Sequence, residues 1–251
     1  MFLKRSYKSE MMDDFSIQDE RIDAALSELK ITNKFLGGVS TTAEGLNLLL
    51  KAIPGTVARN PADEITILDI GAGASDNLFS LRNKFPSVKI TSFDLNKRAC
   101  RFLTTKPVGL GRPPRSDGWS ILKRNYAANV ICADALKIPV KEKQFDIVHS
   151  SLFLHHFKED EIKKMITDFL KISKTGIIIN DLRRSVLALC GIKIISLLFS
   201  KSELFINDAP LSVKRGFVKS ELTKVLADAG IKNFKIRKKW AFRWLLVIYA
   251  E

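Results

Sequence analysis

The stretch that decides the fold is Leu68-Asp69-Ile70-Gly71-Ala72-Gly73-Ala74-Ser75, at the end of a short apolar run that begins at Glu64. Two glycines directly after a predicted strand let a ligand approach the backbone, and the following helix offers unpaired N–H groups in its first turn. A dinucleotide-binding turn would have a third glycine at position 76, where this chain has Asp76. Because an aspartate would repel a pyrophosphate, the turn favours a cationic ligand without phosphate.

Acidic residues follow two further predicted strands. Asp94 ends the strand predicted for residues 88–93, and Asp134-Ala135 follows the one predicted for residues 129–132. A carboxylate at the first position can accept hydrogen bonds from two ribose hydroxyls, and one at the second from an adenine amino group. Together with the glycine turn, these residues predict a nucleoside laid across the carboxyl ends of three strands.

The remaining pattern extends this sheet. Strands are predicted for residues 145–148 and 176–179, with an amphipathic helix between them, and such alternation implies parallel strands with right-handed crossovers. After a helix over 218–229, two strands at 234–237 and 242–249 have a short connection and must be antiparallel. The sequence therefore predicts an α/β fold with a mostly parallel sheet that ends in an antiparallel hairpin. Residues 103–125, rich in proline and glycine, are predicted to form a long loop.

These features together resemble the class I S-adenosylmethionine-dependent methyltransferases. The resemblance covers about residues 60–250 and also includes Phe145-Asp146-Ile147-Val148 and the run from Ser150 to His156. It implies a Rossmann-like seven-stranded sheet, S-adenosyl-L-methionine as cofactor, S-adenosyl-L-homocysteine as product, and no metal. Ser75 stands where many members have a third glycine. The residues expected to bind the cofactor are Asp69, Gly71, Gly73, Asp94, Leu95, Asp134, Ala135 and Ser150.

All three histidines lie between positions 149 and 156, at the end of the fourth predicted strand. His149 lies inside that strand and is expected to be packed. Leu154-His155-His156-Phe157 resembles a stretch of small-molecule O-methyltransferases whose histidine is the general base, which makes His155 the candidate catalytic residue. The same run occurs in members that methylate carbon, where it would only line the pocket. His156 and Arg183 are the candidate substrate-binding residues.

Two predicted cap segments indicate the kind of acceptor. Residues 1–60 are expected to form an N-terminal helical cap, with a capping box at Thr41-x-x-Glu44 and a helix end at Pro54-Gly55. The core would span 61–251, with 186–217 as a second cap segment, in effectively one domain. Both caps are rich in Leu, Ile and Phe, which favours a small hydrophobic acceptor such as a phenol, quinol or polyketide; alternatively, these side chains simply pack onto the sheet.

The net charge of +14 raises a second possibility. A basic protein can bind RNA, an anionic membrane surface or an anionic substrate, whereas scattered lysines are also ordinary on a solvated surface. Residues 235–243, where Lys, Arg, Trp and Phe alternate, favour an RNA methyltransferase. The lack of an added RNA-binding module and of an Asn-Pro-Pro-Tyr motif speaks against it. RNA methylation and C-methylation of a quinone-type substrate stay open as alternatives.

The cysteines and the apolar segments predict the compartment. Three cysteines without Cys-x-x-Cys or Cys/His spacing fit a reducing environment and offer no zinc site. No stretch reaches the roughly 18 uncharged apolar residues of a membrane span, to which residues 186–200 come nearest. The N-terminus lacks the apolar core of a signal peptide. We therefore expect a cytoplasmic protein without an integral membrane segment.

Overall fold

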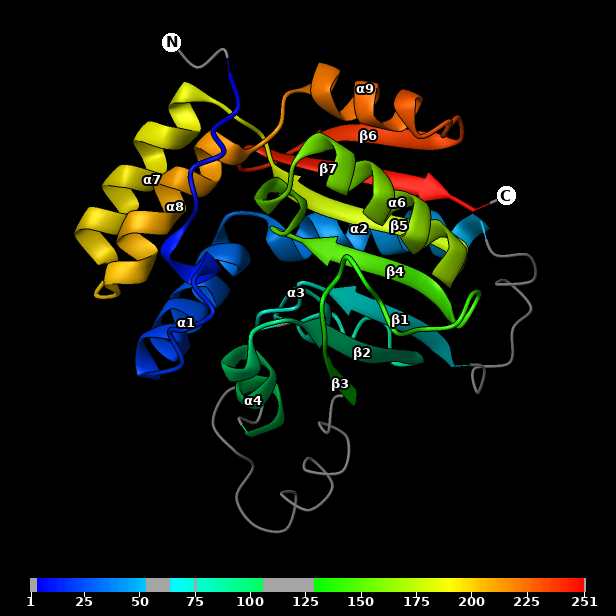
Figure 1. The fold of residues 1–251 in the computed structure, drawn as a ribbon, viewed down its shortest axis with the longest axis horizontal. Coiled ribbons are helices and arrows are strands. Elements are labelled where there is room, and N and C mark those ends of the chain that lie inside the picture. The colour runs from blue at the N-terminus through cyan, green and yellow to red at the C-terminus, as the bar shows by residue number, and fades with distance from the viewer. Residues whose placement is uncertain (1–3, 53–63, 75, 106–128, 251) are drawn as a thin grey trace.

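A computed structural model describes residues 4–52, 64–74, 76–105 and 129–250 (Figure 1). Its centre is a seven-stranded sheet with the order β3-β2-β1-β4-β5-β7-β6. The strands from β1 to β5 pair in parallel, and β7 pairs antiparallel with both β5 and β6. The predicted mostly parallel sheet with antiparallel strands at its end is thus confirmed. The strands are β1 Ile65–Ile70, β2 Val88–Asp94, β3 Asn129–Cys132, β4 Phe145–Ser151, β5 Ser173–Leu182, β6 Phe234–Lys239 and β7 Arg243–Tyr249.

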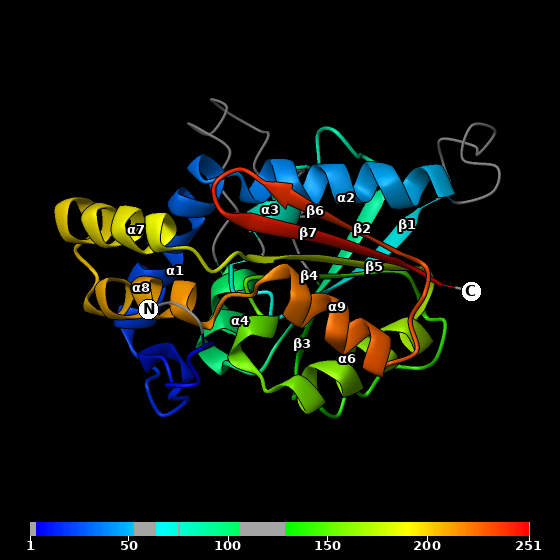
Figure 2. The same cartoon turned by 90° about the horizontal axis from the view of Figure 1, so that it is seen from above.

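Helices cover both faces of the sheet, so the fold has three layers (Figure 2). Side chains alternate between the two faces along each strand. Val148 and its neighbours on one face form a core with α6 and α9, and Ile147 on the other face packs beneath α2. Gly45 lets α2 approach closely, since a Cβ there would lie 2.6 Å from Ile178. The helices are η1 Met11–Asp13, α1 Glu20–Phe35, α2 Gly38–Ala52, α3 Asp76–Phe79, α4 Lys97–Thr105, η2 Leu154–His156, α6 Glu159–Ile172, α7 Val186–Phe199, α8 Glu203–Arg215 and α9 Lys219–Asp228.

A separate group of helices lies beyond the carboxyl ends of β4 and β5 (Figures 1 and 2). Helix α8 is at its centre and packs against α7, α1, η1 and η2. Helix α2, in contrast, packs against β5 and β7 and belongs to the layers of the sheet. The predicted division at residue 60 therefore does not follow the packing. We propose that residues 4–36 and 186–215 form the cap.

The start of α2 differs from the sequence prediction. The helix begins at Gly38, so Thr41 is buried inside it and does not cap its start. The chain turns instead at Gly37, whose φ of +74° favours glycine and whose Cβ would lie 2.3 Å from the backbone oxygen of Trp240. The close packing of this turn on the β6–β7 connection thus sets the helix start.

Three other predictions fall wholly or partly outside the described residues. Pro54-Gly55 and Ser75 lie there, as does the predicted loop from residue 106 onward. Residues 103–105 of that loop belong to α4. None of the helices formed by the described residues is long and apolar enough to span a membrane.

Candidate functional site

A cavity of about 820 Å³ lies between the carboxyl ends of the parallel strands and the cap helices. One wall consists of the turns that follow β1, β2 and β3. The opposite walls come from the segment before α1 and from α1, α7 and α8. The sheet and the cap therefore enclose one continuous space.

Asp94 is the central polar residue of the sheet-side wall. Its Oδ2 accepts a hydrogen bond from the Gly73 N–H at 2.8 Å, and its Oδ1 accepts one from the Asn96 N–H at 2.8 Å. Burial raises the pKa of this carboxyl group, and the two N–H donors oppose the increase. Because each carboxylate oxygen can accept two hydrogen bonds, both retain capacity for a ligand hydroxyl.

The other predicted residues of this wall lie beside Asp94. Gly71 has φ +67°, and a Cβ there would lie 2.1 Å from the ring of Phe153, so the turn requires glycine. Asp134 lines the cavity, and its Oδ1 accepts the Leu136 N–H at 2.9 Å. The structure thus brings six of the predicted cofactor residues to one wall: Gly71, Gly73, Asp94, Leu95, Asp134 and Ala135.

Asp69 and His149 form a buried pair at the base of the cavity. Asp69 Oδ1 lies 2.7 Å from His149 Nδ1, and His149 Nε2 lies 3.1 Å from Thr42 Oγ1 on α2. His149 is 1% exposed, so it is packed as predicted, yet both of its ring nitrogens are hydrogen-bonded. Because Asp69 contacts His149, its expected contact with the cofactor stays a prediction.

Ser150, also predicted to bind the cofactor, is not among the residues that line the cavity. It pairs in register with Ile70 and Ile179, whose side chains belong to the core beneath α6, so Ser150 faces that core. The next residue, Ser151, lines the cavity and accepts a hydrogen bond from Asn77 Nδ2 at 2.7 Å. A shift of one residue along a strand reverses the face, so the structure places Ser151 rather than Ser150 at the cavity.

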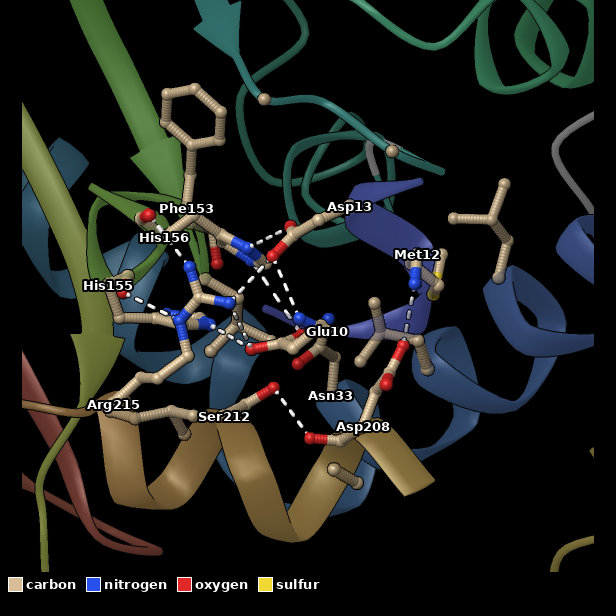
Figure 3. Close-up of a pocket in the computed structure, with 18 of the residues that line it drawn as sticks. Glu10, Met12, Asp13, Asn33, Phe153, His155, His156, Asp208, Ser212 and Arg215 are labelled. Atoms are coloured by element: carbon tan, nitrogen blue, oxygen red, sulfur yellow. Dashed lines mark hydrogen bonds and ion pairs between the residues drawn. The ribbon is translucent and has the colours of Figure 1, made fainter. Parts of the chain in front are cut away.

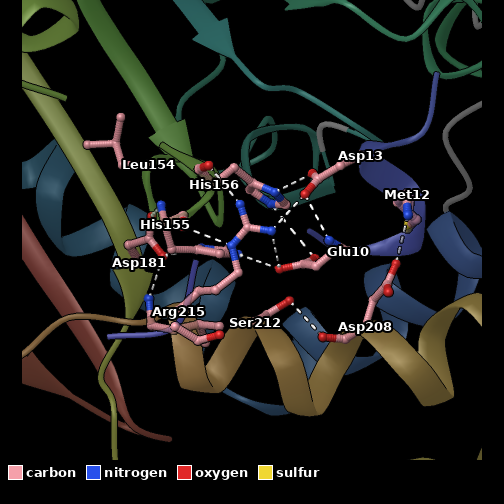
Figure 4. Close-up of polar contacts among 12 residues, drawn as sticks. Glu10, Met12, Asp13, Leu154, His155, His156, Asp181, Asp208, Ser212 and Arg215 are labelled. Atoms are coloured by element: carbon pink, nitrogen blue, oxygen red, sulfur yellow. Dashed lines mark hydrogen bonds and ion pairs between the residues drawn. The ribbon is translucent and has the colours of Figure 1, made fainter. Parts of the chain in front are cut away.

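His155 lies at the far side of the cavity between two carboxylates (Figure 4). It is 2% exposed; its Nδ1 lies 2.6 Å from Asp181 Oδ1, and its Nε2 lies 3.6 Å from Glu10 Oε1. Burial alone would lower the pKa of His155, but the charges of Asp181 and Glu10 raise it to about 9. The ring therefore carries its proton at neutral pH, whereas a general base must be unprotonated.

His156 belongs to the same polar cluster (Figure 3). Its Nδ1 lies 2.7 Å from Asp13 Oδ1, and its Nε2 lies 3.9 Å from Glu10 Oε2. Arg215 donates from Nη1 to Asp13 Oδ2 at 2.6 Å and approaches Glu10 Oε1 at 3.6 Å. Burial would raise the pKa of Asp13, but its contacts with His156 and Arg215 hold it well below its usual range. The cluster is thus a network of partnered charges in the cavity wall.

The sequence analysis did not identify most of this cluster, and it assigned substrate binding to a different arginine. Arg183, the predicted substrate-binding residue, lies outside the cavity wall, with its guanidinium 5.1 Å from the ring centre of Phe242. Arg215 is the arginine that lines the cavity near the histidines. The only local signal was the acidic N-terminal run that contains Glu10 and Asp13. Nothing in the sequence distinguished Arg215 from the other basic residues.

Much of the cap-side wall is apolar. It contributes Leu26, Leu29, Leu36, Ala188, Ile192, Ile195, Phe205 and Val213. This surface begins beside the polar cluster and continues along α1, α7 and α8. The arrangement gives an acceptor a largely hydrophobic chamber that borders the polar cluster and also contains Thr32, Asn33, Asp208 and Ser212.

Comparison with known proteins extends these observations. Residues 68–179, from β1 through most of β5, match the family described as methyltransferase domain. Human N-acetylserotonin methyltransferase, solved with S-adenosylmethionine, is similar over 98% of this chain and 60% of its own, at 13% identity and a TM-score of 0.59. An O-methyltransferase family protein from Burkholderia thailandensis is similar over 98% and 65% of the two chains, at 15% identity and a TM-score of 0.59.

A third solved structure has a different named acceptor. Magnesium protoporphyrin IX methyltransferase from Synechocystis PCC 6803, solved with S-adenosylmethionine, is similar over 86% of this chain and 80% of its own, at 13% identity and a TM-score of 0.52. At such identities the similarity shows the fold. This chain spans about three fifths of the length of the first solved structures that it matches. No curated protein matches it.

The matched domain contains the glycine turn, Asp94 and Asp134. The seven-stranded sheet and its antiparallel end agree with the fold that the resemblance implied. The wall formed after β1, β2 and β3 is where the sequence predicts S-adenosylmethionine to bind. The chain is thus similar over residues 68–179 to the methyltransferase domain family, and it has the fold of the solved methyltransferases.

Proposed function

We propose that this protein is an S-adenosylmethionine-dependent methyltransferase that acts on a small hydrophobic acceptor and transfers the methyl group to a hydroxyl oxygen. The observation that carries the proposal is the single cavity, which joins the cofactor-side wall to the apolar surface of α1, α7 and α8. Its volume of about 820 Å³ lies within the usual range for small-molecule sites, about 300–1,000 Å³. The sheet-side wall would hold the cofactor, and the apolar chamber the acceptor.

The reaction is an in-line displacement at the sulfonium methyl group. An oxygen lone pair of the acceptor forms the new O–C bond while the C–S bond breaks and its electrons pass to sulfur; the hydroxyl proton must also leave. Because a sulfonium and a phenolate neutralise each other in the transition state, a chamber without water favours the transfer. The general-base role of His155 stays a prediction, and the ion pairs with Asp181 and Glu10 argue for a different role.

The solved relatives support a small-molecule acceptor in general terms. N-acetylserotonin and magnesium protoporphyrin IX, the compounds that two of them are named for, are both small molecules. Their different sizes and shapes mean that the shared fold does not select one acceptor. The choice of a hydrophobic acceptor for this chain therefore rests on its own cap residues.

The structure weakens the argument for RNA methylation that the basic strip at residues 235–243 provided. Within residues 235–243, Arg237 and Lys239 both pair with Glu44 of α2. Arg243 is 2% exposed, and its Nη2 donates to Asn33 Oδ1 at 2.6 Å. These three basic side chains are thus engaged within the protein, which reduces the charge that this strip offers to phosphates.

Methyl transfer from labelled S-adenosylmethionine to a panel of alkylated phenols, quinols and bulk RNA tests the proposal. We expect an O-methylated product from a hydrophobic hydroxyl compound, at a rate that changes little between low and physiological salt. An RNA interface with several phosphate contacts would instead lose about 10³-fold or more in affinity over that range. Methylated RNA with such a salt dependence, or a methyl group on carbon, would contradict the proposed reaction.

The cofactor role of Asp94 is tested by Asp94→Ala. We expect S-adenosylmethionine to bind more weakly by about 1.5–3 kcal/mol, because a charge-assisted contact to the ribose is lost. Isothermal titration calorimetry gives the affinity, and a thermal melt shows whether the fold is kept. Asp228→Ala, on the exposed end of α9, is the matched control and should bind normally. Equal affinities for the two variants would remove Asp94 from the site.

Two adjacent isoleucines of α7 test the acceptor chamber. Ile195 lines the cavity, whereas Ile194 is 57% exposed on the outer face of the same helix. Ile195→Asn should raise the KM for a hydrophobic acceptor by about tenfold or more, since about 1.5–3 kcal/mol of apolar burial is at stake. Ile194→Asn should leave the KM unchanged. Steady-state kinetics with the best compound of the panel decide the matter: equal KM values would place the acceptor elsewhere.

A further inference from the structure

Three side chains of the polar cluster point their ligand atoms at one another. The carboxylate of Glu10 and one ring nitrogen each of His155 and His156 lie within 4.8 Å of one another. The rings face Glu10 through Nε2, and each Nδ1 is held by a further carboxylate: Asp181 at 2.6 Å and Asp13 at 2.7 Å (Figure 4). In metal sites the second nitrogen of a histidine ligand is usually held in this way, which fixes the ring and its tautomer.

Two of these atoms have unused bonding capacity. Among the described residues, neither His155 Nε2 nor Glu10 Oε1 has a hydrogen-bond partner, although the two side chains are only 2% and 5% exposed. The distance of 3.6 Å between them is too long for a hydrogen bond. It is close to the roughly 3.4 Å expected between two ligands that each lie about 2.1 Å from one tetrahedral ion. Since unpaired buried polar atoms cost free energy, the pair calls for a shared partner.

We propose that Glu10, His155 and His156 bind a divalent transition-metal ion such as Zn²⁺ in the cavity wall. Two imidazoles and one carboxylate suit Zn²⁺, Fe²⁺ or Co²⁺, whereas Mg²⁺ and Ca²⁺ prefer oxygen ligands alone. Three protein ligands leave a coordination position for another molecule. In a role that rests on the proposed function, the acceptor hydroxyl would occupy that position, where a metal lowers the pKa of a bound hydroxyl.

The charges of the cluster accommodate such an ion. Glu10, Asp13 and Asp181 carry three negative charges, and Arg215, which contacts Asp13 and Glu10, carries one positive charge. Metal binding displaces the proton that His155 otherwise carries, so both imidazoles are then neutral and these four groups sum to −2, which a divalent ion balances. The sequence analysis looked for a zinc site only in the spacing of the cysteines. The ligands proposed here include Glu10, which is far from the two histidines in the sequence.

Metal binding is measured on the full-length protein after treatment with a chelator. Calorimetry with Zn²⁺ and visible absorption with Co²⁺ should both give one ion per chain. Glu10→Gln and His156→Asn should each weaken binding by about tenfold or more, and Asp13→Asn by about 10- to 100-fold, because the ring of His156 loses its holding carboxylate. Glu161→Gln is the matched control: Glu161 also lines the cavity, but its Oε2 accepts the Lys158 N–H at 2.8 Å.

The outcomes separate the metal site from the proposed function. Absence of binding to a folded wild-type protein, or binding that survives both Glu10→Gln and His156→Asn, would overturn the metal site. Far-UV circular dichroism and a thermal melt of each variant show that the fold is kept. Metal binding without transfer to any hydroxyl compound would contradict the proposed reaction and leave the site in place. Full transfer by a protein that binds no metal would contradict the metal site and leave the proposed reaction in place.

Discussion

Buried charge holds the N-terminal segment against the ends of β4 and β5, and the acceptor side of the cavity depends on it. Arg5 donates from Nε to the backbone oxygen of Arg215 at 2.7 Å and from Nη2 to those of His155 at 2.9 Å and Phe157 at 3.0 Å. Asp208 of α8 accepts hydrogen bonds from the N–H groups of two residues of η1. Since a buried charge without partners is costly, these contacts fix the segment in one place. Glu10 and Asp13 reach the cavity only because of that placement (Figure 3).

The cofactor half of the site could be predicted because its residues follow strands directly. In parallel strands, the residue after each strand lies at the same edge of the sheet, so the turn at Gly71 and the aspartates Asp94 and Asp134 had to meet. The sheet itself followed from apolar runs of strand length alternating with helical patterns. The antiparallel end followed from the short connection between the last two strands, a topological argument that needs no contact between side chains.

The acceptor half could not be predicted, because its contacts join residues far apart in the sequence. No local pattern indicates that Glu10 faces two histidines of η2 or that Arg215, at the end of α8, completes the cluster. An error of one residue along a strand moves a side chain to the opposite face of the sheet. Ser150 and Ser151 differ by one position and lie on opposite faces of β4. The start of α2 depended on the packing of Gly37 against Trp240, which a capping pattern at Thr41 does not reveal.

The two halves of the cavity have different electrostatic characters, which fits the division of roles that we propose. The sheet-side wall offers Asp94 and Asp134, whose oxygens accept hydrogen bonds and favour a cationic nucleoside. The cap side combines an apolar surface with a cluster in which opposite charges are paired. A sulfonium at the boundary would thus have carboxylates on one side and a hydrophobic chamber on the other.

A crystal structure of the complex with S-adenosyl-L-homocysteine tests this division most directly. The account predicts the ribose hydroxyls within hydrogen-bond distance of Asp94, the adenine beside Asp134, and the sulfur directed toward the chamber lined by α1, α7 and α8. A nucleoside bound on the cap side, or one bound without contact to Asp94, would contradict it.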